Sequence, residues 1–401
     1  MSTTTAAPPA TLATLASDFY GVQTELAPAE QDQVLRIRVF LEREVRPIAD
    51  DCWDRAEFPH HLIPGLADLG LFGAHLPETA RFENGMLYRG WVALELARVD
   101  PSIATFVGVQ TGLTMTAIAG GGSPEQREQW LPPMGRGEVM GAFGLTEPYS
   151  GSDTSRGLRT TAERRGDTWV LHGAKRWIGN ATFADVIVVW AKDVADDQVK
   201  GFLVRTGAPG LTVTKIERKQ ALRTVQNADI ELDGVEVAEE DRLQRVSSFR
   251  DVAAVLRPTR AEVAWQAVGL AVGAYEAAVA YVARREQFGR PLGSFQLVQD
   301  KLAESLADIT ASIALCRRLS LLAEEGNQRD EHAALAKSFA TTRMRATVAR
   351  CREVLGGNGI QLDHGVARYF ADAEAVYTYE GTRDMNTLIV GRAITGVQAF
   401  V

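Results

Sequence analysis

The segment 377–384 places a carboxylate, that of Glu380, between an aromatic residue and a glycine, directly before an expected helix. A carboxylate in an apolar, ligand-covered pocket has its charged form disfavoured, which makes it a stronger base toward carbon acids. The same residues could instead cap the helix, with Thr382 or Asp384 at its start and Glu380 in solvent. The spacing alone does not choose between a catalytic base and a capping turn.

Two segments nearer the middle of the chain could bind a ligand. The first, 143–153, is dense in hydroxyl side chains and glycines. Such a strand-to-loop edge can offer backbone N–H groups and a hydroxyl to a planar polar ligand, or its own Ser and Asp side chains can satisfy the turn. The second, 175–180, contains Trp177, and a tryptophan in a strand is usually a core residue. Together the two segments could form the wall of an aromatic-lined pocket.

A basic cluster and a glycine-rich turn lie further along the chain. Arg284, Arg285 and Arg290 surround a break between two expected helices. Guanidinium groups match phosphate oxygens, so the cluster could clamp a pyrophosphate; the alternative is an exposed basic loop. The turn 356–359, Gly-Gly-Asn-Gly, could let the backbone approach a ligand or another chain, and a helix C-cap explains it equally well.

The elements that must position these residues change type along the chain. Apolar residues recur every three or four positions over 30–138, which predicts helices. Over 139–245 short β-branched and aromatic runs alternate with turn signals and predict antiparallel strands. Long helical periods return over 246–401, and residues 1–29 are expected to be a loose tail. The predicted fold is α+β and mostly α: an N-terminal helical domain, a middle antiparallel β-domain and a C-terminal four-helix bundle.

Composition narrows the classes of function. Among 401 residues, 43 Lys and Arg stand against 51 Asp and Glu, and this net charge of −8 argues against nucleic acid as the main partner. The three cysteines are an odd number without metal-binding spacing, so we expect reduced thiols, no disulfide framework and no metal site. No basic residue precedes Arg36, so neither a secretory nor a mitochondrial signal is indicated and a cytoplasmic location is expected.

One apolar stretch, 263–282, raises the question of a membrane helix. Its Gly269 and Gly273 have the spacing of a membrane-helix pairing motif. Gln266 and Glu276 interrupt it, and a charge near the middle of a bilayer is costly. We therefore expect a soluble helix whose glycines allow close packing, and no membrane span.

Taken in order, these segments resemble the signatures of the acyl-CoA dehydrogenase family over nearly the whole chain, from about residue 30 to 400. The most specific matches are the run 145–153 and the turn 379–382. The chain is most similar to the glutaryl-CoA dehydrogenase branch and to plant short-chain acyl-CoA oxidases, through 391–396 and 177–180. The resemblance implies a flavoprotein oxidoreductase that uses FAD to convert an acyl-CoA into a trans-2-enoyl-CoA in fatty acid or amino acid catabolism.

The resemblance also assigns roles to single residues. Glu380 would be the catalytic base. Residues that would contact FAD are Phe143, Leu145, Thr146, Ser152, Trp177, Ile178, Gly356, Gly357, Thr382 and Asp384, with Arg285, Phe288 and Gln296 reaching it from a neighbouring subunit. Residues that would contact the substrate are Ser152, Ala104, Arg260, Tyr379 and Gly381.

Substrate, acceptor and assembly follow from the same resemblance. Glutaryl-specific enzymes place an arginine for the distal carboxylate where this chain has Ala104, and an acidic partner where it has Ala97. A second carboxylate would be buried unpaired, so we predict a short or medium, uncharged acyl group. An electron-transfer flavoprotein or similar acceptor and a homotetramer built as a dimer of dimers are expected. The alternatives are an oxidase that passes electrons to oxygen, a glutaryl-CoA dehydrogenase, and a catalytically inactive helical scaffold.

Overall fold

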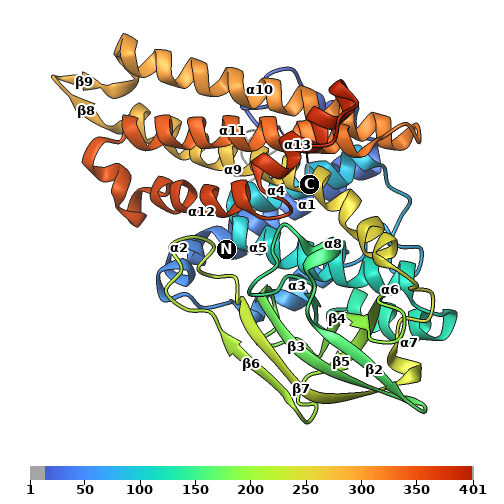
Figure 1. Cartoon of the computed structure of the whole chain (residues 1–401). Coiled ribbons are helices and arrows are strands. Elements are labelled where there is room, and N and C mark those ends of the chain that lie inside the picture. The colour runs from blue at the N-terminus through green and yellow to red at the C-terminus, as the bar shows by residue number, and fades with distance from the viewer. Residues whose placement is uncertain (1–13, 400–401) are drawn as a thin grey trace. The chain divides into compact units, whose positions relative to one another are not determined.

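The computed structural model describes residues 14–399, and the chain divides into two compact units that each combine distant segments (Figure 1). We call the first the bundle unit; it contains the chain up to Asp50, Gly85–Pro101 and Ala261–Tyr377. We call the second the sheet unit; it contains Asp51–Asn84, Ser102–Arg260 and the chain from Thr378 onward. The three consecutive segments expected from the sequence are thus redistributed, because two of them contribute to both units.

The bundle unit is built from long helices. Its α10 and α11 lie side by side, and α4 packs against α1 and α10. Part of the expected loose tail is packed here, since Leu15, Ser17 and Val22 are buried, while residues 1–13 lie outside the described residues. The helices that lie wholly or partly in this unit are α1 (Pro28–Phe40), α2 (Arg46–Arg55), α4 (Met86–Val99), α9 (Phe249–Arg284), α10 (Gln296–Glu324), α11 (Asp330–Val354) and α12 (Val366–Thr378).

The sheet unit contains a seven-stranded sheet in the order β1-β4-β2-β3-β7-β6, with β5 paired to β4. Every residue of β4 except Lys192 is buried, as its continuous apolar run requires. The strands are β1 (Gly141–Gly144), β2 (Thr161–Arg165), β3 (Thr168–Ile178), β4 (Val186–Asp193), β5 (Val199–Arg205), β6 (Leu211–Lys215) and β7 (Ala228–Ala238). Helices of this unit include α3 (Ile63–Asp68), α5 (Pro101–Val107), α6 (Thr116–Gly121), α7 (Pro124–Gly135), α8 (Thr154–Gly157) and α13 (Arg383–Thr395).

The sheet is mixed, which corrects the expectation of purely antiparallel strands. β4 pairs in parallel with both β1 and β2, while the β2–β3, β3–β7, β4–β5 and β6–β7 pairs are antiparallel. Parallel neighbours need a long connection, and the chain between β1 and β4 supplies one. Strand period alone does not reveal this, because it is the same for both pairings.

Charged side chains are buried in the bundle unit as a connected network around Arg98. The guanidinium of Arg98 binds Glu42 at 2.7 Å, Glu276 at 2.8 Å and Glu95 at 3.1 Å, and Glu95 also binds Arg38 at 2.5 Å. Burial acts to raise the pKa of Glu95, but Arg98 and Arg38 outweigh it and the pKa is lowered. The buried carboxylate is therefore held ionised by two cations.

The glycines of the 263–282 stretch pack against another helix of the bundle unit. A Cβ at Gly269 would lie 2.1 Å from the Leu94 carbonyl oxygen, and one at Gly273 would lie 2.2 Å from the Arg98 carbonyl oxygen. By length and composition alone, two described helical stretches could cross a membrane, Pro101–Gly121 and Phe249–Arg284, but 56% and 72% of their most apolar windows are buried inside the protein. The two glycines thus serve the close approach of α9 to α4.

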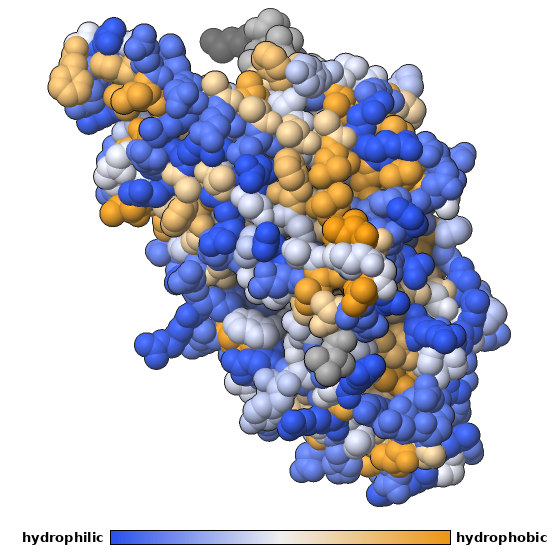
Figure 2. Space-filling model, turned by 45° about the horizontal axis from the view of Figure 1, so that its top comes forward, coloured by the Kyte–Doolittle hydropathy of each residue, from blue (hydrophilic) through white to orange (hydrophobic). Residues whose placement is uncertain are grey.

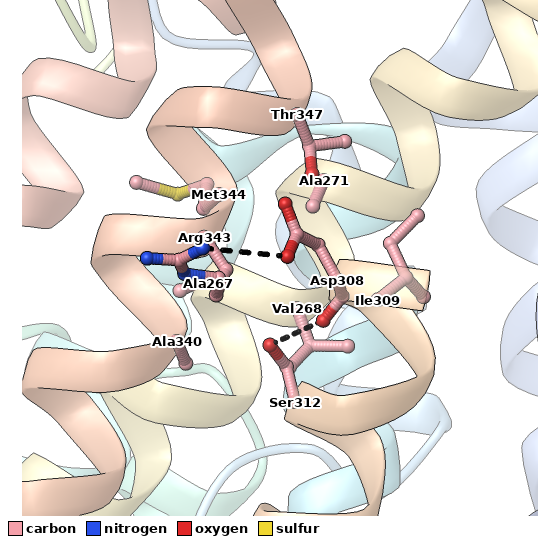
Figure 3. A pocket seen from close by; sticks show the side chains of 10 residues that line it. All are labelled: Ala267, Val268, Ala271, Asp308, Ile309, Ser312, Ala340, Arg343, Met344 and Thr347. Carbon is pink, nitrogen blue, oxygen red and sulfur yellow. Dashed lines mark hydrogen bonds and ion pairs between the residues drawn. The ribbon is translucent and has the colours of Figure 1, made fainter. Parts of the chain in front are cut away.

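A narrow crevice runs between α9, α10 and α11 (Figure 3). Its lining is mainly small and apolar, and its charged members, Asp308 and Arg343, pair with each other at 3.7 Å. None of the residues that the sequence singled out for chemistry lines it. We therefore regard it as a packing feature of the bundle unit.

Replacement of Gly269 by alanine tests the close α9–α4 contact. Gly269→Ala should lower the free energy of unfolding by about 1–3 kcal/mol or more, because the new methyl group meets backbone that cannot turn away. The measurement is urea unfolding followed by circular dichroism. Gly391→Ala in α13 is the matched control, since a Cβ there meets nothing within 4 Å, and it should leave stability unchanged or raise it. Equal stability of the two variants would contradict the packing role.

Candidate active site

Glu380 has an unusual backbone and a specific partner. Its φ is 54°, in the left-handed region that non-glycine residues rarely adopt, and Gly381 follows with φ 82°. Its half-buried side chain accepts a hydrogen bond from the hydroxyl of Thr259 on α9, with 2.6 Å between Oγ1 and Oε2. Strained backbone of this kind is concentrated at functional sites. The carboxylate is aimed and held, rather than left in solvent.

The turn around Glu380 also begins a helix, so the capping interpretation is correct for Thr382. Thr382 is the N-cap of α13, with its Oγ1 accepting from the Met385 N–H at 3.3 Å. The fully buried Asn386 donates from Nδ2 to the carbonyls of Gly381 at 2.8 Å and Thr382 at 3.0 Å. The exposed Asp384 pairs with Arg383. The cap and the asparagine fix the turn, which leaves the Glu380 side chain for chemistry.

The loop after β1 is fixed by a buried ion pair. Lys175 Nζ lies 2.8 Å from Glu147 Oε1 and 3.2 Å from the Leu145 carbonyl oxygen. The Glu147 carboxylate also accepts from the N–H groups of Arg159 at 2.7 Å and Thr160 at 3.0 Å. One carboxylate thus ties together the loop 145–160 and β3.

The electrostatics of this pair follow from burial. Burial lowers the pKa of Lys175 to about 8, although Glu147 acts in the opposite direction. Burial also acts to raise the pKa of Glu147, but the Lys175 ammonium and the hydrogen bonds that the carboxylate accepts lower it overall. Both groups are therefore ionised at neutral pH, and each compensates the desolvation of the other.

Trp177 is exposed, although a tryptophan in a strand usually lies in the core. It lies where the pairing of β3 with β7 is irregular, its φ is 65°, and 51% of it is accessible. An irregularity of this kind redirects a side chain. The backbone beside it is fixed, because the Arg176 N–H donates to the Thr146 carbonyl at 2.8 Å and Asn227 donates to the Trp177 carbonyl at 3.3 Å. Trp177 and Thr146 are thereby held next to each other.

The other residues expected on the flavin side differ in exposure. Phe143 packs against Trp190 and is buried, as are Leu145 and Ile178. Thr146 is half-buried and Ser152 is exposed. The three buried side chains would thus support the binding surface from within, and any contact with FAD remains a prediction for all of these residues.

The residues expected at the substrate lie in the same unit as Glu380. Ala104 on α5 is buried, and Tyr379 and Arg260 are half-buried. No hydrogen bond or ion pair joins the Arg260 side chain to another described residue. Its guanidinium is therefore available to a ligand.

The remaining predicted residues belong to the bundle unit, and the structure leaves them exposed. Arg285, Phe288 and Gln296 surround the small hairpin of β8 (Glu286–Gln287) and β9 (Arg290–Pro291). Phe288 is 94% accessible and has φ 54°. In Figure 2, apolar atoms cap the projection at the upper left, where this hairpin lies in Figure 1. Gly356 and Gly357 are also exposed, and a Cβ at either would meet nothing within 4 Å.

Three positioning residues were missed by sequence reasoning: Thr259, Lys175 and Asn386. Lys175 lies in the segment 175–180 that the sequence singled out, but its own side chain was given no role there, and Thr259 precedes an arginine that was noticed. Asn386 carries no local signal, because polar residues are common on an exposed helix. In residues 14–399 there is also no cluster of His, Cys, Asp or Glu arranged to hold a metal ion.

Three family models match consecutive parts of the chain. They describe the acyl-CoA dehydrogenase N-terminal domain at residues 28–138, the middle domain at 142–235 and the C-terminal domain at 249–395. Together they cover most of the 401 residues and include Glu380, Thr259, Trp177 and the Glu147–Lys175 pair.

Known proteins are similar over almost the full length. An acyl-CoA dehydrogenase of Bacillus subtilis is 32% identical over 91% of this chain and 98% of its own. Two structures of glutaryl-CoA dehydrogenase from Mycobacterium smegmatis are also similar, each with a TM-score of 0.92 over 96% of this chain. The first is 38% identical and is matched over 99% of its own chain. The second, in complex with FADH2, is 34% identical and is matched over 98% of its own chain. Butyryl-CoA dehydrogenase from Megasphaera elsdenii is 31% identical, with a TM-score of 0.87, over 92% of this chain and 98% of its own.

The fold and the site thus define a flavoprotein oxidoreductase with helical N- and C-terminal regions around a middle sheet. The chain belongs to the acyl-CoA dehydrogenase family. Its cofactor is FAD, and its class of reaction is the dehydrogenation of acyl-CoA thioesters.

Removal of the Lys175 ammonium tests the role of the buried pair. Lys175→Met should lower the free energy of unfolding by about 3–5 kcal/mol, because it leaves the Glu147 carboxylate buried without a cation. Lys200→Met is the control, since its partner Asp196 is exposed, and it should cost at most about 1 kcal/mol. Chemical denaturation of both variants gives the comparison. The double variant Lys175→Met/Glu147→Gln should recover part of the loss, and no recovery would contradict the electrostatic explanation.

Proposed function

We propose that Glu380 is the base that removes the α-proton of an acyl-CoA whose acyl group is short or medium and uncharged. The observation that supports this role is the geometry of the residue: a left-handed backbone, a half-buried carboxylate and a hydrogen bond to Thr259 that fixes its direction. A solvated capping residue would need none of these features.

The chemistry requires a fixed base and prompt stabilisation of charge. The α-proton of a thioester is weakly acidic, so charge that develops on the carbonyl oxygen must be stabilised as the proton leaves. The backbone N–H of Glu380 is a donor suited to that oxygen, because it belongs to the residue that takes the proton. Asn386 and the Thr382 cap hold this turn, so the base and the donor keep one geometry.

The residues of the sheet unit fit a flavin. Trp177 presents half of its surface beside the half-buried Thr146, and the backbone of both is fixed by hydrogen bonds. An exposed ring and a loop with hydroxyls suit a planar polar ligand. FAD, when bound, supplies the acceptor for the hydride of the β-carbon. The protein's own part is to orient the thioester, exclude water and hold the α-proton on Glu380.

The acyl preference rests on the absence of a cation at position 104. Ala104 is 1% exposed, and its neighbours Ile103 and Phe106 are fully buried apolar residues. Ala104 itself offers a distal carboxylate no cation, and an unpaired buried charge is costly. An uncharged acyl group meets no such penalty.

Anaerobic titration tests the base and the acyl preference together. Butyryl-CoA and isovaleryl-CoA should bleach the flavin absorbance, while glutaryl-CoA should do so at least about 100-fold less efficiently, since an unpaired buried carboxylate costs several kcal/mol. Glu380→Gln should abolish bleaching by every thioester, because an amide cannot accept the proton.

The variant Ala104→Arg provides the matched control for the acyl preference, and it should raise the rate with glutaryl-CoA and lower that with butyryl-CoA. Bleaching of the flavin by butyryl-CoA in Glu380→Gln would refute the role of Glu380 as the base. Efficient turnover of glutaryl-CoA by the natural protein would refute the proposed preference for an uncharged acyl group. Hydrogen peroxide formed in air without an added acceptor would indicate an oxidase.

The assembly is proposed to complete the cofactor site. Phe288 lies almost fully exposed in strained backbone, and exposed apolar groups of this kind are characteristic of interfaces. We propose that the β8–β9 hairpin, with Arg285 and Gln296, reaches FAD in a neighbouring copy of a homotetramer. An electron-transfer flavoprotein as acceptor and a cytoplasmic location likewise remain predictions.

A charge at the hairpin tip tests this assembly. Phe288→Asp should lower the molar mass in solution, measured by light scattering after gel filtration, and should reduce the FAD content per chain severalfold. Val194→Asp is the control, because Val194 is also exposed but lies in the loop after β4 of the sheet unit. A Phe288→Asp protein with unchanged mass and full FAD content would contradict the proposal.

A further inference from the structure

The hydroxyl of Thr259 lies between two acceptors. Its Oγ1 is 2.6 Å from Glu380 Oε2 and 2.8 Å from the carbonyl oxygen of Leu256, one turn earlier in α9. Thr259 is 5% exposed, and both contacts lie within the sheet unit. Thr259 therefore sits where α9 meets the turn that carries the base.

A threonine hydroxyl has one hydrogen, so it can donate to only one of these acceptors at a time. The ionised carboxylate is the stronger acceptor, because hydrogen bonds to a charged group are about twice as strong as those between neutral groups. Once the carboxyl group is neutral, the two oxygens compete on nearly equal terms. The direction of the hydroxyl thus depends on the protonation of Glu380.

We infer that Thr259 is the positioning residue that orients the Glu380 carboxylate before the reaction and releases it after proton transfer; this rests on Glu380 being the base. Thr259 engages Oε2, and no described residue hydrogen-bonds Oε1. Oε1 is then the oxygen that takes the proton. When the α-carbon–hydrogen bond breaks, the proton would bind Oε1, and the electron pair of that bond would stay on the substrate to form the double bond, with bound FAD as the acceptor of the β-hydride. The Thr259 hydroxyl can then turn to the Leu256 carbonyl.

Other charged groups of the sheet unit lie along the same two elements. On the sheet-unit part of α9 these are Arg250, Asp251, Arg257 and Arg260, and on α13 they are Arg383, Asp384 and Arg392, of which Arg383 and Asp384 pair with each other at 3.4 Å. Among the described residues none of them forms an ion pair with Glu380. They contribute a background field that a substitution at Thr259 leaves in place, so a change in pH response can be attributed to the hydroxyl.

The test is the pH dependence of flavin reduction by saturating butyryl-CoA, followed by anaerobic stopped flow on the FAD-loaded protein. Thr259→Val keeps the shape and removes the hydroxyl. Because the ionised carboxylate loses a hydrogen bond, the acid limb of the rate profile should move to higher pH by roughly one unit. The concentration of butyryl-CoA that gives half the maximal rate should change by less than about twofold, since the Thr259 hydroxyl is engaged by Glu380 and the Leu256 carbonyl. Thr259→Ser should restore the natural profile.

Thr310→Val on α10 is the matched control, since its hydroxyl donates to the Leu306 carbonyl at 2.7 Å without a carboxylate partner, and its profile should match that of the natural protein. Should Thr259→Val lose FAD or its cooperative thermal transition, Thr259→Ala makes the same comparison. A Thr259→Val profile that superimposes on the natural one, while Glu380→Gln is inactive, would overturn this inference alone. Reduction that persists in Glu380→Gln would overturn the proposed function instead.

Discussion

Glu380 and Trp177 hold a backbone conformation that L-amino acids rarely adopt, and a small set of specific contacts fixes each of them. Each such residue costs of the order of 1–3 kcal/mol and persists only when its surroundings fix it. At Glu380 the surroundings are Thr259, the Thr382 cap and Asn386. At Trp177 they are the irregular pairing of β3 with β7 and the hydrogen bonds beside it. Local strain is thus offset by bonds that also aim the two side chains.

Buried ion pairs join distant segments within each unit. The Glu147–Lys175 pair joins the loop after β1 to β3, two residues before Trp177 in that strand. In the bundle unit the Arg98 network joins α1, α4, α9 and the π-helical segment Leu41–Val45. Buried pairs add little net stability but are costly to break from one side. They therefore fix which arrangement forms rather than how stable it is.

Charge also explains the expected selectivity. Each buried carboxylate of these two networks has a cation within hydrogen-bond distance, whereas the side chain of Ala104 offers none. The same physical rule that stabilises Glu95 and Glu147 would exclude a second carboxylate on the substrate. The similarity to glutaryl-CoA dehydrogenases and to butyryl-CoA dehydrogenase is compatible with either acyl group, so the residue at position 104 is the more informative observation.

The sequence by itself determined the order of helices, strands and helices and the family, and it singled out Glu380 as the candidate base, because hydrophobic period and short motifs are local properties of the chain. It also predicted that the glycines of 263–282 allow close packing, and both lie against the backbone of α4, while Glu276 is paired with Arg98. Only the tertiary structure decided that Thr259, 121 residues away, holds Glu380, that Trp177 faces outward and that β4 has parallel neighbours. These facts depend on which distant segments pack together, and local periodicity is the same whichever partner a segment finds.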